Sequence, residues 1–408
     1  MMSGPLTGLR VVDMSRILAG PSMTQLFADL GAEIIKIERP GRGDDTRTWG
    51  PPWLKDTQCN DTREAGYYLS ANRGKHSITV DVSQPDGVEL IRDLVREADF
   101  FVENFKVGGL AKLGLDYENL KQINPQLIYL SITGFGQSGP DAPLPGYDYL
   151  IQARSGLMSI TGPEDGAPGA GPVRAGVATS DLQTGLMGAI GLLSALHHRH
   201  QTGEGQYIDL ALLDTQIAGL ANQGFNHLMS GKVPVRTGSW HPSLAPYQPF
   251  DTADDQIIIA VGNDTQFADM CKFIGAPEMS GDERFSTNPA RNKNRAIMAE
   301  LINARTKLQP ASHWLEGFTA NNVPASPINN IKQAFEDPQV QARNMQIEVD
   351  HPVAGTMPGM ATPLKFSKTQ IEYNKSAPML GEDTDDVLSR LLGKSQDEIS
   401  RLKRQGIV

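Results

Sequence analysis

The sequence predicts an α/β protein with a large doubly wound domain and a smaller α+β domain. Its first 135 residues alternate short runs rich in β-branched residues with amphipathic stretches, the pattern of strands joined by crossover helices in a parallel sheet. A further strand-like run and several helical stretches follow after about residue 225. The length of 408 residues also favours two or three domains over one.

Five strands are expected in the first part, each a short apolar run bounded by polar or turn residues. They cover residues 9–14, 33–38, 76–82, 99–104 and 127–133. Apolar side chains near a 3.6-residue period predict the intervening helices at 21–30, 86–97 and 116–123. A Rossmann-like sheet of this kind binds its ligand at the carboxyl ends of the strands.

The middle of the chain is richer in glycine and proline than the part before it. Two Gly/Pro-rich segments between residues 134 and 176 flank a helical piece at 151–158, and they are expected as surface loops or as a mobile cover over a site. A long helix is expected from about Asp181 to His200, ending at Gly203, and residues 202–214 contain another strand.

The expected domain limits place a small domain inside a larger one. Residues 1–200 form the first part of the large domain, 201–225 a linker, 226–328 the small domain, and 329–408 a linker that returns to the large domain. Within these limits a strand is expected at 256–262, and helices at 265–274, at 296–304, at 329–345 with a break at Pro338, and in the tail from Thr384.

Charge and cysteine content exclude several classes of function. The 37 basic and 47 acidic residues give a net charge of −10, so neither nucleic acid nor a membrane is expected as a partner. No apolar run reaches the roughly 18 residues of a membrane-spanning helix, and the first strand begins too early for a signal peptide, which favours a cytoplasmic location. Cys59 and Cys271 lie far apart, and His197, His198 and His200 are typical of a solvated helix end, so no metal is expected.

Common nucleotide-site motifs are absent. No G-x-G-x-x-G follows the first strand, which disfavours NAD, and neither a P-loop nor a G-x-S-x-G motif occurs. Basic residues instead gather near the predicted strand ends, where they suit a small phosphate-bearing ligand, although each one alone is explained as well by ordinary surface charge. They are Lys36, Arg39, Arg42, Arg47, Arg73, Lys75, Lys106 and Lys112.

Asp181 is the most informative acid. It follows a glycine-rich segment and opens the long helix, so its carboxylate is expected to meet the positive helix end and to stay ionised as a nucleophile. A plain N-capping role is the alternative, because aspartate is a favoured capping residue.

Several sequence segments occur in an order that is typical of one enzyme family. They include GLRVVDMSRILAGPSM, ANRGKHSITVDV, VENFKVGGLAKLGL, SITGFGQSGP, TGEGQYIDLALLD and the tail from LGEDTDDVL. Together they resemble class III CoA-transferases, the CaiB/BaiF-type family named after carnitine and bile-acid CoA-transferases. The resemblance runs from about residue 6 to the C-terminus.

The resemblance implies a covalent mechanism at Asp181, which matches the family's catalytic aspartate in ATSDLQTG. Its carboxylate would attack an acyl-CoA thioester, and an aspartyl-CoA thioester would then pass CoA to a carboxylic acid acceptor. The implied CoA contacts are Ile17, Leu18, Ala19, Arg39, Asn104, Phe105 and Lys112. CoA thioesters would be substrates with no permanently bound cofactor, and the implied assembly is an intertwined, ring-like homodimer.

Three further segments are similar to succinyl-CoA-dependent dicarboxylate transferases, notably the glutarate type: GYDYLIQARSGLMSITGPEDG, HPSLAPYQPF and AVGNDTQF. A dicarboxylate needs a cation for its distal carboxylate, and the candidates are Arg47, Arg73, Arg154 and Arg174. Formyl-CoA transferases carry arginine in place of Lys112 and lysine in place of Thr133, and they have a glycine-only flap that this chain lacks, which disfavours oxalate and formyl transfer.

Two other functions remain open. The α-methylacyl-CoA racemases share this fold and use a histidine within a G-H-D triplet, whereas this chain has Gly146-Tyr147-Asp148. A tyrosine with a pKa of about 10 is a poor acid or base at neutral pH, so racemisation is disfavoured. A catalytically silent acyl-CoA-binding protein would not need Asp181.

Overall fold

The computed structural model describes residues 4–408, which form two compact units. Unit 1 consists of the residues up to Leu157 together with Ala175–Gly231 and Gln339–Val408. Unit 2 consists of Met158–Arg174 and Lys232–Pro338. The second unit therefore uses two separate stretches of the chain.

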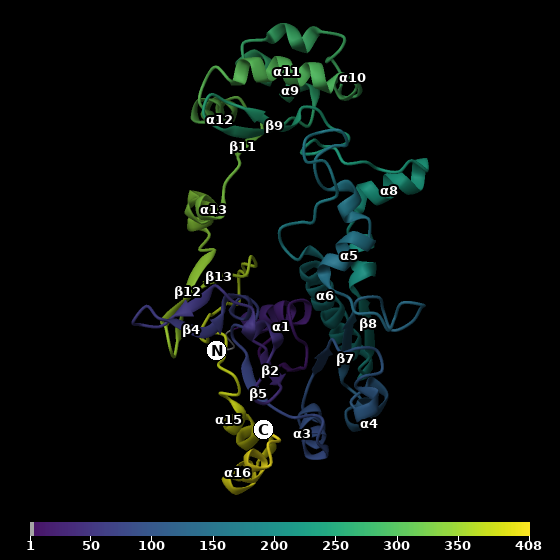
Figure 1. Cartoon of the computed structure of the whole chain (residues 1–408), viewed down its shortest axis with the longest axis vertical. Coiled ribbons are helices and arrows are strands. Elements are labelled where there is room, and N and C mark those ends of the chain that lie inside the picture. Colours follow the sequence, from purple (N-terminus) through teal and green to yellow (C-terminus); the bar gives the residue numbers. More distant parts are fainter. Residues whose placement is uncertain (1–3) are drawn as a thin grey trace. The chain divides into compact units, whose positions relative to one another are not determined.

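Unit 1 is built on a six-stranded parallel sheet with the order β5-β2-β1-β6-β7-β8. Of these strands β2, β5, β7 and β8 are labelled in Figure 1. The strands are β1 (Arg10–Asp13), β2 (Glu33–Glu38), β5 (His76–Thr79), β6 (Phe100–Glu103), β7 (Ile128–Thr133) and β8 (Tyr207–Ala211). All five strands expected in the first part are present, and the strand expected within 202–214 completes the sheet. The strand order reverses between β1 and β6, which is where doubly wound sheets bind ligands.

Helices cover both faces of this sheet because successive strand residues point to opposite sides. Val11 packs in one apolar cluster and Val12 in the other, and both are fully buried. The Val11 side is covered by α1 (Ala19–Asp29), α5 (Asp148–Arg154), α6 (Thr179–Thr202) and the start of α7 (Leu212–Ala218). The Val12 side is covered by α3 (Pro85–Val95), α4 (Tyr117–Ile123), α15 (Thr384–Leu392) and α16 (Gln396–Arg404).

Unit 1 also contains small elements that the sequence did not predict. Two antiparallel hairpins join β3 (Trp53–Lys55) to β4 (Asp61–Ala65) and β12 (Gln346–His351) to β13 (Gly355–Met360). The unpredicted helices are α2 (Gly66–Leu69) and α8 (Ala221–Ser230), with the single turns η1 (Asp45–Thr48) and η2 (Ala111–Leu113). At two points where the chain passes from one unit to the other lie the turn η3 (Leu157–Ile160) and the helix α14 (Pro338–Ala342), which falls within the helical stretch expected at 329–345. Strand β4 is mostly polar, and β13 contains both glycine and proline, so neither shows a regular alternation of apolar residues.

Unit 2 has its own three-stranded antiparallel sheet and its own apolar core. The sheet contains β9 (Tyr247–Asp251), β10 (Gln256–Ala260) and β11 (Ala325–Pro327). Its helices are α9 (Asp264–Phe273), α10 (Asn288–Lys293), α11 (Arg295–Thr306), α12 (Ala311–Ala320) and α13 (Ile331–Glu336), with the turn η4 (Pro277–Gly281). Cys271 is buried in this core, as its apolar neighbours in the sequence indicate.

Two boundaries differ from the expected ones. Residues 201–225, expected as a linker, contain β8, which pairs with β7 at the edge of the unit 1 sheet. The smaller unit also recruits Met158–Arg174 from the Gly/Pro-rich region. The expected break at Pro338 is confirmed, since α13 ends at Glu336 and α14 begins at Pro338.

Across residues 4–408 no helix is long and apolar enough to cross a membrane.

Candidate active site

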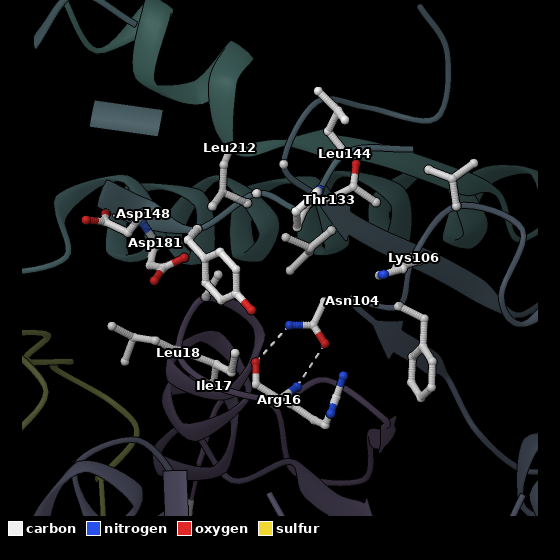
Figure 2. Close-up of a pocket in the computed structure, with 18 of the residues that line it drawn as sticks. Arg16, Ile17, Leu18, Asn104, Lys106, Thr133, Leu144, Asp148, Asp181 and Leu212 are labelled. Carbon is white, nitrogen blue, oxygen red and sulfur yellow. Dashed lines mark hydrogen bonds between the residues drawn. The ribbon is translucent and has the colours of Figure 1, made fainter. Parts of the chain in front are cut away.

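A pocket of about 170 Å³ opens at the carboxyl ends of β1, β6 and β7 in unit 1 (Figure 2). Its walls come from the loop at residues 16–19, from residues 104–107, from the end of β7 and from the loop that leads into α5. Asp181 from α6 also lines it. The pocket brings together six of the eight site residues predicted from the sequence: Ile17, Leu18, Ala19, Asn104, Phe105 and Asp181.

The two remaining predicted residues lie elsewhere. Arg39, directly after β2, lines a neighbouring pocket of about 380 Å³ together with Lys36 and Arg42. Arg16 and Phe105 line both pockets, so the two are adjacent. Lys112 is exposed within η2 and lines neither pocket. Phosphate binding at Arg39 is therefore compatible with the geometry, whereas the structure does not bring Lys112 to the same place.

The loop between β1 and α1 forms one wall of the pocket and is held in an unusual shape. Asn104, directly after β6, fixes this loop, because its Oδ1 accepts a hydrogen bond from Arg16 N at 2.9 Å and its Nδ2 donates to Arg16 O at 2.7 Å (Figure 2). The next residue, Ile17, has φ of 74°. A β-branched residue in this left-handed region is strained by about 1–3 kcal/mol, and such strain concentrates at functional sites.

The first turn of α1 follows this loop and lies at the pocket. Its N-cap residue Leu18 provides no capping side chain, and the first N–H groups of any helix have no partner inside the helix. Because these N–H groups and the helix dipole favour negative charge, the start of α1 can stabilise an oxyanion that develops beside Leu18 and Ala19.

Asp181 does not cap α6, contrary to the N-cap alternative. It is the third residue of the helix, and Asp148 from α5 accepts hydrogen bonds at Oδ1 from the backbone N–H groups of Ser180 (2.8 Å) and Asp181 (3.2 Å). Gln152 Nε2 donates to the other oxygen of Asp148 at 2.6 Å. Figure 2 shows the two carboxylates side by side.

The electrostatic environment of Asp181 also differs from the expectation. Burial, and after it the negative charge of Asp148, raises the pKa of Asp181 to about 7. The expectation that the helix end keeps Asp181 ionised is therefore wrong, because burial raises its pKa and because Asp148, rather than Asp181, accepts hydrogen bonds from the first N–H groups of α6. Asp181 therefore exchanges its proton near neutral pH, where an ordinary surface aspartate is fully ionised.

Most of the arginines proposed for a distal carboxylate already have carboxylate partners. Arg47 binds Glu38 and Arg73 binds Asp29, each at 2.7 Å and nearly out of contact with solvent. Arg154 pairs with Asp141. Arg174 is exposed and belongs to unit 2.

Other cations line the pocket itself. Arg16 is paired with Asp45 at 2.9 Å, whereas Lys106 is exposed and has no ion pair within residues 4–408. Thr133 also lines the pocket, and its Oγ1 accepts a hydrogen bond from Gly136 N at 3.0 Å. Tyr147, which replaces the racemase histidine, lines the pocket with 58% of its surface exposed.

Sequence reasoning missed Asp148 and Arg16 as pocket residues. Arg16 directly precedes the predicted contacts, so its position alone could have indicated it. Asp148 bonds to a helix that starts more than thirty residues later in the chain, and no spacing rule finds such a pair. Within residues 4–408 no group of His, Cys, Asp and Glu side chains is arranged to hold a metal ion.

Comparison with known proteins identifies the family. The sequence model of CoA-transferase family III matches residues 6–384 of this chain. The chain belongs to CoA-transferase family III. Its pocket is thus the candidate active site of a CoA-transferase.

Relatives of this CoA-transferase match it over nearly their whole length. A succinate–glutarate CoA-transferase of Agrobacterium fabrum is 47% identical over 387 residues, which cover 95% of this chain and 96% of the relative. A succinyl-CoA:glutarate CoA-transferase of Homo sapiens is 42% identical over 406 residues, 99% of this chain and 90% of the relative. The crystal structure of a CaiB/BaiF family protein from Brucella suis superimposes with a TM-score of 0.84 at 47% identity, covering 95% of this chain and 100% of that one.

Proposed function

We propose that this CoA-transferase moves CoA from succinyl-CoA to a short dicarboxylate such as glutarate, with Asp181 as the nucleophile. The observation that carries the proposal is the position of Asp181 in the pocket at the carboxyl ends of β1 and β6, beside the strained loop that leads into α1. The names of the relatives, which are succinate–glutarate and succinyl-CoA:glutarate CoA-transferases, support the donor and the acceptor.

The reaction would proceed through covalent intermediates on Asp181. Its carboxylate attacks the thioester carbonyl of succinyl-CoA, the C–S bond breaks, and a succinyl-aspartyl anhydride and CoA thiolate result. The thiolate attacks the aspartyl carbonyl, which releases succinate and forms an aspartyl-CoA thioester. Glutarate attacks this thioester and expels the thiolate, which then attacks the glutaryl carbonyl to give glutaryl-CoA and free Asp181. The cycle consumes no proton or electron.

The surroundings of Asp181 suit a weak nucleophile. A carboxylate that is desolvated by burial is more basic and more reactive, and its raised pKa reflects this cost. The N–H groups at the start of α1 would stabilise the oxyanion of each tetrahedral intermediate. The adjacent pocket with Arg39 would hold the phosphate-bearing end of CoA.

We further propose that the protein forms a homodimer, intertwined as the family resemblance implies. Support comes from apolar side chains that unit 1 leaves exposed on two helices: Leu186 and Ile190 on α6 expose 58% and 56%, and Leu228 on α8 exposes 79%. Such surfaces mark interaction sites. Sedimentation equilibrium would give twice the chain mass, and a monomer would contradict this proposal. The cytoplasmic location and the lack of a permanently bound cofactor stay predictions.

Mass spectrometry after incubation with succinyl-CoA tests the reaction. We expect the peptide that contains Asp181 to carry a CoA thioester in the wild type and no adduct in Asp181→Ala. A racemase would instead exchange the α-proton of a 2-methylacyl-CoA with solvent deuterium without an adduct. Solvent exchange without an adduct would replace the transferase proposal by the racemase.

A further inference from the structure

The loop between β1 and α1 is fixed by side chains from several parts of the fold, and one of them, Asp44, does not line the pocket that contains Asp181. We propose that Asp44 is a positioning residue that holds Ile17 in its left-handed conformation and thereby aims the N-terminus of α1 at Asp181. This inference rests on the proposed function, because it concerns the N–H groups that would stabilise the oxyanion there.

Three consecutive backbone N–H groups in this loop bond to side-chain oxygens from three different places in the fold. Ser15 N donates to Asp13 Oδ1 on β1 at 2.9 Å, and Arg16 N donates to Asn104 Oδ1 after β6 at 2.9 Å. Ile17 N donates to both oxygens of Asp44, at 3.3 and 3.2 Å. The chain then enters α1, whose first N–H groups remain available to a ligand.

Ile17 is the position in this loop that needs such support. At a φ of 74° its branched side chain is disfavoured, and the residue would relax toward the β or α region if nothing opposed it. Relaxation would turn the peptide groups that follow, and these are the groups at the start of α1. The hydrogen bond to Asp44 opposes that rotation directly.

Asp44 is itself held rigidly. Its side chain is fully buried, with Lys36 Nζ at 3.0 Å from Oδ2, and Thr46 donates to Oδ1 from its backbone N at 3.0 Å and from its Oγ1 at 2.8 Å. Lys36 Nζ also donates to Ser15 O at 2.9 Å, so the same cation anchors Asp44 and the loop that Asp44 supports. The Asp44 carboxylate is therefore held in place, because moving it would leave the buried Lys36 charge without its partner.

Asp44 also lines the second pocket, beside Arg39 and Arg42. It therefore lies between the pocket proposed for the CoA phosphates and the loop at Asp181. Pre-organisation of catalytic donors by such a supporting residue affects the rate of the chemical steps more than substrate binding.

The test compares glycine and alanine at position 17 in two backgrounds, wild type and Asp44→Ala, because alanine leaves Ile17 N without its acceptor at position 44. Both substitutions at position 17 remove the isoleucine side chain, but only glycine adopts this backbone conformation without strain. We expect Asp44→Ala to lower kcat about ten- to hundredfold, as a misplaced catalytic group does, with a smaller change in KM for succinyl-CoA. Ile17→Gly should then exceed Ile17→Ala in kcat about fivefold or more in the Asp44→Ala background, because glycine needs no support. In the wild-type background the two should be similar.

The same ratio of kcat between Ile17→Gly and Ile17→Ala in both backgrounds, or a wild-type kcat in Asp44→Ala, would overturn the role of Asp44. If Asp44→Ala does not fold, the thermal stability of Ile17→Gly and Ile17→Ala decides. Glycine should be at least as stable as alanine at position 17, and a more stable Ile17→Ala would show that no strain is held there. The adduct on Asp181 separates the two proposals, since it tests the transferase mechanism and does not depend on Asp44.

Discussion

The burial of Asp181 costs folding stability, and the same burial makes its carboxylate more basic, which would favour the nucleophilic role proposed for it. The same carboxylate would be ionised on a surface, but burial and Asp148 raise its pKa to about 7. A group whose pKa is raised on folding binds its proton more tightly in the folded state, so its ionisation destabilises the fold as pH rises toward the folded pKa. Functional sites often carry such a cost.

Asp181→Asn tests both consequences. We expect transfer to fall about a thousandfold or more, because the nucleophile is lost, while CoA still binds by calorimetry. Thermal denaturation should show that the stability of Asp181→Asn relative to the wild type increases as pH rises from about 4 to about 7. Above about pH 7 this difference in stability should stay constant. In the wild type, kcat/KM should rise with pH through about 7. A stability difference that does not change with pH would contradict the buried, titrating carboxylate.

The placement of CoA is tested at Arg39 and Lys112, both of which the sequence predicted as contacts. Arg39 lines the second pocket and Lys112 does not. We expect Arg39→Ala to raise KM for succinyl-CoA about tenfold with little change in kcat, because a distant phosphate contact is the same in the ground and transition states. Lys112→Ala is the matched control and should have a smaller effect. An unchanged KM in Arg39→Ala would refute the phosphate site.

At the scale of elements, the sequence predicted the repeated strands of the parallel sheet and missed the hairpins outside it. The parallel strands were predictable because they are buried on both faces and appear as short apolar runs, as in the fully buried IYLSIT of β7. The β3–β4 hairpin was not, because DTREA in β4 is mostly polar and is recognised only by its partner strand. The start of α6 was also misjudged, since its cap comes from α5 rather than from its own sequence.

Asp148 accepts hydrogen bonds from the start of α6 and also raises the pKa of Asp181. Asp148→Asn removes the charge but keeps an oxygen that can accept from Ser180 and Asp181, so the pH midpoint of kcat/KM should fall below that of the wild type while burial keeps it above the ordinary value. Asp148→Ala also removes the cap and should lower stability by about 0.5–2 kcal/mol. Urea denaturation and pH profiles of the two variants separate the effects. An unshifted midpoint in Asp148→Asn would contradict the electrostatic coupling.

At the scale of the whole molecule, local patterns predicted the doubly wound sheet and the edge of the sheet at which the candidate site lies. Six of the eight predicted site residues share one pocket because they directly follow strands β1 and β6 or start a helix on the sheet. The arginines for a distal carboxylate could not be chosen from sequence, since ion pairs such as Arg73 with Asp29 join residues 44 positions apart. Only the folded chain shows which cations are already neutralised.

The cations that are not already paired with a carboxylate should decide which acid the enzyme uses as CoA acceptor. With succinyl-CoA as donor, we expect glutarate to exceed acetate about ten- to hundredfold in kcat/KM, because a second carboxylate gains a charge-assisted contact in the pocket. Lys106 is the cation to test, since it lines the pocket without a carboxylate partner within residues 4–408 and points toward the pocket centre in Figure 2. Lys106→Gln should reduce the rate with glutarate and leave that with acetate nearly unchanged. An equal loss with both acceptors would assign Lys106 to CoA, and equal wild-type rates for glutarate and acetate at subsaturating concentration would refute the dicarboxylate preference.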